Sequence, residues 1–361
     1  MPESRTIFMA GGGTGGHVIP AIAVARELAS RGHRPIFVGT PTGFEARLVP
    51  ASGFPLELIE IGGLKRVGLL QTIRTLAQLP IGFGKALNLF SRYRPSAIFS
   101  MGGFVAGPVV LAGIRRSLPI VVMEPNAMPG MTNRRIGRWV SRALLSFPEA
   151  ERFFPRGKTE ITGLPVRHEF FELPPRPSPA NPLTILITGG SRGSRTLNDA
   201  ARASWPLFRN APFPVRLIHQ TGTGAHESIA SAFAATGLEG SIVPFIEDMP
   251  AAFAEADLVI CRSGAGAVAE LAAAGKPALL VPFPFAADQH QLKNAEALAR
   301  ASAATLILDR DMTGPRLFSE VARLHAAPDL LVAMGQNART FAHPGAAQRA
   351  AEILEQLSHG N

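Results

Sequence analysis

The chain of 361 residues has one cysteine, one tyrosine and two tryptophans, and only 17% of its residues are charged. The single cysteine, Cys261, excludes an intramolecular disulfide and a cysteine-rich zinc site, and is typical of a reducing compartment. Because it follows Val259 and Ile260, we expect a buried strand residue rather than a nucleophile. Hydrophobic residues make up 46% of the chain, which excludes disorder, and the length predicts about two domains.

The N-terminus has glycines where a secretion signal would need an apolar region. The uncharged stretch 96–114 approaches the length of a membrane-spanning helix, but it contains Pro108 and several glycines. We therefore expect a buried strand, a glycine turn and a helix in this stretch, and a soluble protein.

Acidic residues are absent between Glu60 and Glu124, whereas basic and large apolar residues alternate there. Three interpretations are open: a solvated face beside a core face, docking on an anionic membrane surface, or nucleic-acid binding. The aromatic residues Phe83, Phe90 and Tyr93 form no obvious stacking platform, so nucleic acid is the least favoured.

Two glycine-rich turns, at 11–16 and 189–193, each follow a short apolar run and precede a helical pattern. A strand, a glycine turn and a helix N-terminus expose backbone N–H groups beside a positive dipole end, which favours phosphate. Two such units predict a nucleotide site between two Rossmann-like halves that face each other across a cleft.

Short apolar runs separated by helical patterns recur in both halves of the chain. The predicted fold class is therefore α/β, with two Rossmann-like domains built on parallel sheets. We expect a first domain at 1–170, a linker at 171–182, a second domain at 183–343, and a C-terminal helix at 344–361 that packs on either domain. The linker is assigned because five prolines fall within 172–182.

Several polar residues near these turns have two interpretations each. His17 is either a capping or core histidine or a catalytic group. Glu270 is either a solvated residue of a helix face or a carboxylate that accepts hydrogen bonds from a ribose. The apolar run at 35–38, which follows the first predicted helix, ends in Gly39 and Thr40 and not in an acid that could bind a ribose. This disfavours NAD as the ligand. Asp309 and Asp311 superficially resemble an Asp-x-Asp metal motif, but we interpret 309–311 as a loop outside the expected site.

The residues together resemble the GT-B glycosyltransferases, and among them the N-acetylglucosaminyltransferases of peptidoglycan synthesis. The motifs that carry the resemblance occur in order along the whole chain; they are 12–17, 101–108, 124–126, 163–167, 189–191, 262–265, Glu270 and 288–295. The resemblance implies the GT-B architecture and transfer of N-acetylglucosamine from UDP-N-acetylglucosamine to lipid I, with inversion.

The resemblance also implies which residues bind the donor. Glu270 would hold the ribose, Ile246 the uracil, and Ser191 with Arg167 the diphosphate. The remaining donor-binding residues would be Thr14, Gly15, Gly16, Asn126, Ala265, Gly266, Ala267, Val268, Ala269, Gln289 and Gln291.

An inverting transfer needs a base, and we assign this role to His17, with Glu124 as the alternative. The acceptor carries a lipid, so the resemblance favours the membrane interpretation of the basic stretch. The acceptor and membrane residues would be Gly102, Gly103, Phe104, Lys65, Arg66, Arg74, Phe83 and Lys85. No metal or other cofactor is expected, because helix N-termini and Arg167 could neutralise the diphosphate.

The expected partners are UDP-N-acetylglucosamine, lipid I, the anionic inner-membrane surface at its cytoplasmic face, and other cell-wall and division proteins, but no nucleic acid. Two rivals remain open: a diacylglycerol glycosyltransferase with the same donor, and a nucleotide-sugar sensor without catalysis. Assays with lipid I and with diacylglycerol as acceptors distinguish the proposed enzyme from the diacylglycerol glycosyltransferase. Turnover of any kind excludes the nucleotide-sugar sensor.

Overall fold

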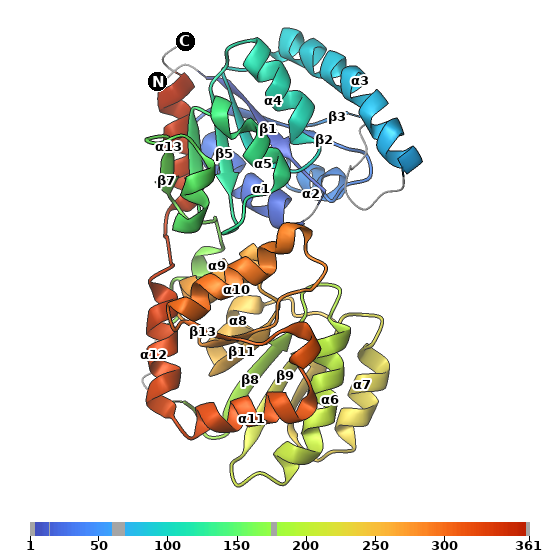
Figure 1. Ribbon diagram of the computed structural model, residues 1–361, viewed down its shortest axis with the longest axis vertical. Coiled ribbons are helices and arrows are strands. Elements are labelled where there is room, and N and C mark those ends of the chain that lie inside the picture. Colours follow the sequence, from blue (N-terminus) through green and yellow to red (C-terminus); the bar gives the residue numbers. More distant parts are fainter. Residues whose placement is uncertain (1–3, 14, 60–68, 175–178, 359–361) are drawn as a thin grey trace. The chain divides into compact units, whose positions relative to one another are not determined.

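The computed structural model describes residues 4–13, 15–59, 69–174 and 179–358, with the backbone alone at 69–79. The chain divides into two compact units, Met1–Pro165 with Gly345–Asn361, and Val166–Pro344. Each unit is a parallel sheet with helices packed on it (Figure 1). The predicted α/β class with two Rossmann-like parallel sheets is therefore confirmed.

The sheet of the first unit has the order β3-β2-β1-β4-β5-β6-β7. Its strands are β1 Thr6–Gly11, β2 Arg34–Gly39, β3 Leu56–Leu58, β4 Ala97–Gly102, β5 Ile120–Glu124, β6 Arg142–Leu145 and β7 Thr159–Ile161. The strand order reverses between β1 and β4, and in open α/β sheets ligands bind beside such a reversal, at the carboxyl ends of the strands.

The helices of the first unit are α1 Gly15–Ser30, α2 Glu45–Ala51, α3 Leu69–Tyr93, α4 Ala106–Arg115, α5 Met131–Ile136 and α13 Ala346–Ser358. The stretch 96–114 forms β4, a glycine turn and α4, as predicted. Helix α13, at the end of the chain, packs against α1. Its Glu355 accepts hydrogen bonds from Arg31 and His33.

The second unit repeats this arrangement with the order β10-β9-β8-β11-β12-β13. Its strands are β8 Leu183–Thr188, β9 Val215–Gln220, β10 Glu239–Val243, β11 Leu258–Cys261, β12 Ala278–Leu280 and β13 Ala304–Leu306. Its helices are α6 Arg195–Arg209, α7 His226–Ala234, α8 Met249–Glu255, α9 Ala265–Ala274, α10 His290–Arg300, α11 Gly314–His325 and α12 Pro328–Arg339. The reversal of strand order lies here between β8 and β11.

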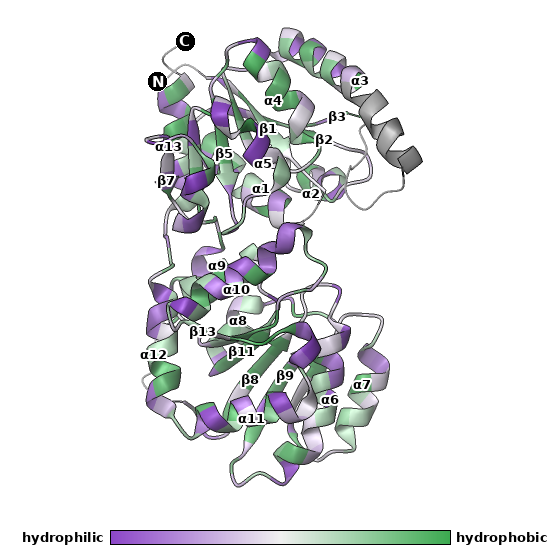
Figure 2. Ribbon diagram, viewed as in Figure 1, coloured by the Kyte–Doolittle hydropathy of each residue, from purple (hydrophilic) through white to green (hydrophobic). Residues whose placement is uncertain are grey.

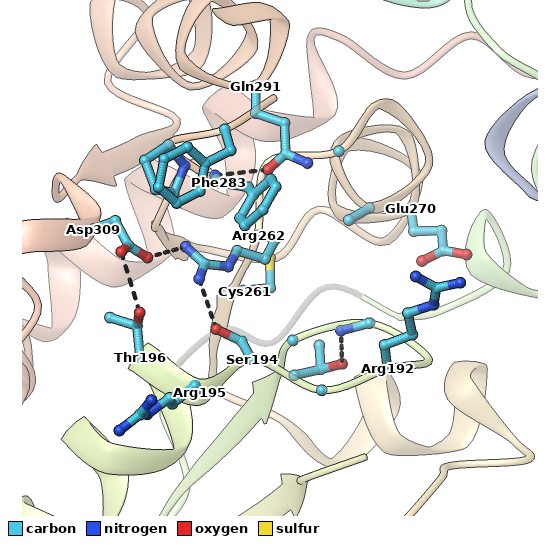
Figure 3. Close-up of a pocket in the computed structure, with 18 of the residues that line it drawn as sticks. Arg192, Ser194, Arg195, Thr196, Cys261, Arg262, Glu270, Phe283, Gln291 and Asp309 are labelled. Atoms are coloured by element: carbon cyan, nitrogen blue, oxygen red, sulfur yellow. Dashed lines mark hydrogen bonds and ion pairs between the residues drawn. The ribbon is translucent and has the colours of Figure 1, made fainter. Parts of the chain in front are cut away.

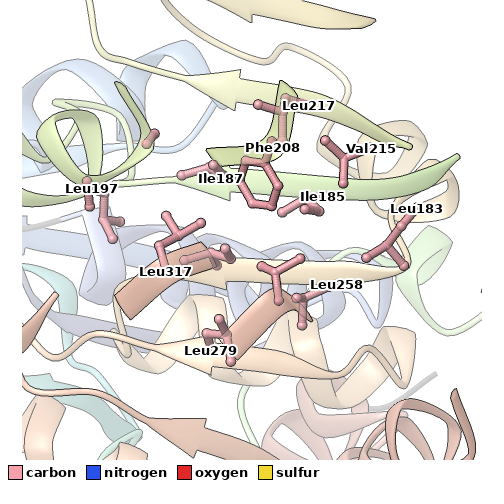
Figure 4. Close-up of a cluster of buried hydrophobic side chains, with 14 of the residues drawn as sticks. Leu183, Ile185, Ile187, Leu197, Phe208, Val215, Leu217, Leu258, Leu279 and Leu317 are labelled. Carbon is pink, nitrogen blue, oxygen red and sulfur yellow. The ribbon is translucent and has the colours of Figure 1, made fainter. Parts of the chain in front are cut away.

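Apolar strands form the centre of the second unit, as the hydrophobic colouring of β8 and β11 shows (Figure 2). Leu183, Ile185 and Ile187 of β8 are at most 1% exposed and belong to one cluster with Phe208 and Leu317 (Figure 4). Fully burying one such side chain contributes about 1.5–3 kcal/mol. The cluster therefore holds α6 and α11 on this sheet, and so fixes the start of α6 beside the end of β8.

The predicted domain boundaries stay predictions. The division into units falls after Pro165, whereas the expected linker is 171–182. Residues 175–178 of that linker lie outside the described residues, and Ala180 donates a hydrogen bond to Asp257. Among the described residues, no helix has the length and apolar character needed to cross a membrane.

Candidate nucleotide-sugar site

A cavity of about 650 Å³ lies at the carboxyl ends of β8 and β11 in the second unit (Figure 3). The second glycine turn and the start of α6 form one side of it. In this turn Gly193 has φ +71°, and a Cβ atom there would lie 1.9 Å from the Thr221 carbonyl oxygen, so glycine is required. The Ser194 side chain caps α6 by accepting from the Leu197 N–H. The cavity thus lies beside a helix N-terminus, an arrangement that suits an anion.

Glu270, on α9, lines this cavity from the opposite side (Figure 3). Burial raises the pKa of its carboxyl group to about 7, while the nearby charge of Arg167 acts in the opposite direction. The guanidinium group of Arg192 also points toward Glu270 (Figure 3). A carboxylate accepts two hydrogen bonds from vicinal hydroxyls, so this position suits a ribose.

Arg262 holds the cavity wall together; it belongs to the motif 262–265, but we assigned it no role from the sequence. Its guanidinium group donates to the Ser194 hydroxyl at 2.7 Å and forms an ion pair with Asp309. Thr196 donates to the second oxygen of Asp309. Our interpretation of 309–311 as a loop outside the site is therefore wrong for Asp309, which lines the cavity. Asp309 follows β13, whose carboxyl end lies at the same edge of the sheet as that of β11.

Gln220, at the end of β9, connects two loops that the donor was expected to contact. Its side chain is 1% exposed and donates to the Gly190 carbonyl at 2.8 Å. Its carbonyl oxygen accepts from the backbone N–H of Ile246 at 2.9 Å. A uracil that binds this N–H must therefore replace Gln220. We did not predict Gln220, because a single glutamine at a strand end gives no distinctive pattern.

Two of the predicted donor-binding residues, Gln289 and Gln291, lie where the chain passes from β12 into α10, and Gln291 belongs to α10 itself. Gln291 lines the cavity, and its side-chain oxygen accepts from the Phe283 N–H at 2.9 Å. Asp288 and Gln289 have φ values of +52° and +54°, in the left-handed region that such residues rarely adopt. Two successive residues in this region store strain, and such strain is typical of ligand-binding segments.

His17 directly follows the first glycine turn and lies in the first helical turn of α1. The His17 Nδ1 lies 3.2 Å from the Gly12 carbonyl oxygen, which can only accept, so Nδ1 donates. The glycine turn between β4 and α4 lies beside the first glycine turn, since a Cβ atom on Gly103 would be 3.2 Å from the Gly12 carbonyl oxygen. The structure thus brings His17 together with the predicted acceptor residues Gly102 and Gly103.

Glu124, the alternative base, ends β5 and is 1% exposed. Its carboxylate accepts hydrogen bonds from the backbone and side chain of Asn126, from the Gly130 N–H and from the Asn133 side chain. Burial raises the pKa of Glu124, although these hydrogen bonds act in the opposite direction. A carboxylate with so many donors is suited to shaping the loop 125–130, which includes Asn126.

Other predicted residues have varied positions. Thr14, Lys65 and Arg66 lie outside the described residues, as does the side chain of Arg74. Lys85 is exposed on α3, whereas Phe83 is half-buried against the core of the first unit. Gly15 and Gly16 begin α1, and Phe104 follows β4.

In the second unit, Ser191 and Arg167 are exposed, and Arg167 lies over the ring of Phe170. Residues 265–269 form the start of α9, where Ala267 lines the cavity and Val268 is buried. Cys261 is the buried last residue of β11, and burial raises the pKa of its thiol to about 12. It is therefore protonated at neutral pH, as expected of a strand residue without nucleophilic character. Over the described ranges, no group of three or more His, Cys, Asp or Glu residues could hold a metal.

Comparison with known proteins agrees with the fold. Residues 7–145 match the glycosyltransferase family 28 N-terminal domain, and residues 184–356 match the C-terminal domain of the same family. The chain belongs to glycosyltransferase family 28.

Two relatives carry the same name, UDP-N-acetylglucosamine--N-acetylmuramyl-(pentapeptide) pyrophosphoryl-undecaprenol N-acetylglucosamine transferase. The protein from Solibacter usitatus is 62% identical over 99% of this chain and 98% of its own length. The protein from Myxococcus xanthus is 38% identical over 97% of this chain and 92% of its own. The crystal structure of MurG from Acinetobacter baumannii matches 98% of this chain and 99% of its own, with 33% identity and a TM-score of 0.82. The predicted resemblance is confirmed.

Proposed function

We propose that this chain is a UDP-N-acetylglucosamine-dependent transferase that forms lipid II by glycosylating the C4 hydroxyl of the N-acetylmuramoyl pentapeptide of lipid I. The observation that carries the proposal is the cavity of the second unit, where the half-buried Glu270 lies opposite a glycine turn and a helix N-terminus. A ribose and a diphosphate need these two kinds of group within one cavity. The names of the relatives supply the sugar and the acceptor.

The donor would lie with its ribose at Glu270 and its diphosphate at Ser191, Arg167 and the start of α6. Gln289 and Gln291, with Asn126 from the first unit, would bind the N-acetylglucosamine. The cavity adds Arg192, which we did not predict, as a further cation near the phosphates. These positive groups would stabilise the charge that develops on UDP as it leaves, without a metal.

His17 would remove the proton from the acceptor hydroxyl while the hydroxyl oxygen attacks the anomeric carbon of the donor. The bond between this carbon and UDP breaks in the same step. A proton on Nδ1, bound to the Gly12 carbonyl, places the lone pair of the neutral ring on Nε2. This is the form that a general base needs. The hydrogen bonds that Glu124 accepts support a role in positioning Asn126 instead.

The test is transfer of labelled N-acetylglucosamine from its UDP donor to a short-chain lipid I analogue, with and without EDTA. We expect transfer that EDTA leaves unchanged and that produces a β-1,4 linkage. Transfer to diacylglycerol in place of lipid I would overturn the assigned acceptor. Loss of transfer in EDTA that Mg²⁺ restores would overturn the metal-free mechanism.

We also propose that the exposed faces of α3 and α4 bind an anionic membrane surface, from which the lipid-linked acceptor is collected. Ile81 on α3 is 60% exposed and Leu111 on α4 is 44% exposed, and the two helices pack together. Lys85 and Arg115 are exposed on the same helices. Apolar side chains flanked by cations suit the interface of an anionic bilayer.

The combined change Ile81→Ser and Lys85→Glu should weaken binding to vesicles that contain anionic lipid by about tenfold or more, since each interfacial cation contributes about 1 kcal/mol. Vesicle sedimentation measures the binding. Leu330→Ser is the matched control, because Leu330 is also exposed, at 36%, but lies on α12 of the second unit. Equal binding by all three proteins would remove this surface from the proposal.

A further inference from the structure

Glu45 is a buried carboxylate of the first unit that the function described above does not use. It begins α2, directly after the turn that follows β2, and its side chain is 0% exposed. Its Oε1 accepts from the backbone N–H of Thr40 at 2.9 Å and from the Thr40 hydroxyl at 2.8 Å. Its Oε2 accepts from the Gly13 N–H at 2.8 Å. The carboxylate therefore joins the end of β2 to the first glycine turn.

Three glycines make room for this carboxylate. A Cβ atom on Gly12, Gly39 or Gly43 would lie within 2.1–2.5 Å of a Glu45 side-chain atom. These glycines belong to three different segments: the first glycine turn, the end of β2 and the turn before α2. Burial alone raises the pKa of Glu45, but the hydrogen bonds from Gly13 and Thr40 outweigh it and lower the pKa. The side chain is therefore ionised at neutral pH and bound in one position.

The Gly13 N–H and the Gly12 carbonyl belong to one peptide group. Glu45 accepts from the N–H at one end of this peptide, and His17 Nδ1 donates to the carbonyl at the other end. A hydrogen bond to a charged acceptor polarises a peptide group and strengthens its carbonyl as an acceptor. The peptide plane is rigid, so an anchor at one end also fixes the direction of the other.

We infer that Glu45 is a positioning residue that acts through the Gly12–Gly13 peptide to orient the His17 ring and to hold its proton on Nδ1. The arrangement places a carboxylate, a peptide and an imidazole in series, so the carboxylate sets the tautomer without touching the ring. This inference rests on the proposed role of His17 for its effect on catalysis, but not for its effect on the tautomer.

The test is Glu45→Gln, which keeps the shape of the side chain. An amide has one acceptor oxygen, so its NH₂ group must face either Gly13 or Thr40, both of which donate. We expect the kcat of transfer to fall by about tenfold to a hundredfold. This is the usual effect of replacing a residue that orients a functional histidine without contacting the substrate. The affinity for UDP, measured by calorimetry, should stay unchanged because the donor cavity belongs to the second unit.

A second readout does not depend on activity. Nitrogen-15 NMR of labelled histidine, assigned through the loss of one signal in His17→Ala, reports which ring nitrogen carries the proton. We expect wild type to carry it on Nδ1, and Glu45→Gln to show a mixture of tautomers. The matched control is Glu320→Gln, since Glu320 is also buried but pairs with Arg316 and Arg323 on α11 of the second unit. It should keep the wild-type tautomer and kcat.

A wild-type ring protonated on Nε2 would overturn the inference, and this measurement does not depend on the folding of Glu45→Gln. An unchanged tautomer and kcat in Glu45→Gln would overturn it equally. If His17→Ala remains active while Glu45→Gln alters the tautomer, the positioning role stands and the assignment of His17 as the base fails. If both changes impair transfer, the double variant should be no slower than His17→Ala alone.

Discussion

Replacing His17 by alanine should lower the kcat for transfer to lipid I by a factor of about 10²–10⁴, the usual contribution of a general base. The affinity for UDP should change little, because the donor cavity is lined by residues of the second unit. The effect should therefore appear in kcat, measured by steady-state transfer, and not in nucleotide binding measured by calorimetry. His17→Gln should be as slow, because an amide can donate to Gly12 but cannot take up a proton.

His325→Ala is the matched control for this prediction. His325 stacks on Phe213 in the second unit and does not line the cavity. We expect it to transfer at the wild-type rate. A His17→Ala protein with more than about a tenth of wild-type kcat would contradict the assignment, because loss of a base removes at least two orders of magnitude. The hydrogen-bonded Glu124 would then have to be reconsidered.

The donor affinity should depend on pH through Glu270. Its pKa of about 7 means that it is mostly a carboxylate near pH 8 and mostly a neutral acid near pH 6. The carboxylate can accept hydrogen bonds from both ribose hydroxyls, whereas the neutral acid carries a proton on one oxygen and accepts fewer hydrogen bonds. The affinity for UDP should therefore be nearly constant above about pH 8 and fall as the pH drops through about 7, down to the weaker affinity of the neutral acid.

Glu270→Gln should bind UDP more weakly at high pH and lose this dependence on pH. Hydrogen bonds to a charged group contribute about 1.5–3 kcal/mol, so the expected loss is about tenfold to 150-fold. Calorimetric titration with UDP at several pH values measures both effects. The matched control is Glu296→Gln, since Glu296 pairs with Lys293 on α10 and does not line the cavity. A Glu270→Gln protein that keeps the wild-type pH dependence would contradict the ribose assignment.

The sequence predicted most of the fold because its signals are local. Runs such as Ile185–Ile187 and the glycine turns that follow them predict buried parallel strands and helix starts, and both sheets contain them. Strand β7 has no such signal, because it has only three residues, Thr159–Ile161, with an acid at the centre. Such a strand forms because it pairs with β6, and not because of its own composition.

The site residues divide in the same way. Glu270 and Gln291 were found because motifs surround them, and both line the cavity. Glu45, at the start of α2, and Gln220, at the end of β9, are single polar residues, and partners such as Gly13 and Ile246 are distant from them in sequence. Asp309 was misjudged because its partner, Arg262, is distant in sequence and follows a different strand, β11. Interactions that depend on tertiary structure leave no periodicity to recognise.

The position of helix α13 has a consequence for biosynthesis. The first unit is interrupted in sequence, since Gly345–Asn361 returns to it after the whole second unit. A ribosome must therefore complete the second unit before the first can acquire its last helix. Until then Arg31 and His33 lack Glu355 as their partner, and the apolar face of α13, with Ile353 and Leu354, has not been synthesised. The half of the enzyme that is translated first thus cannot finish folding until Gly345–Asn361 has been synthesised.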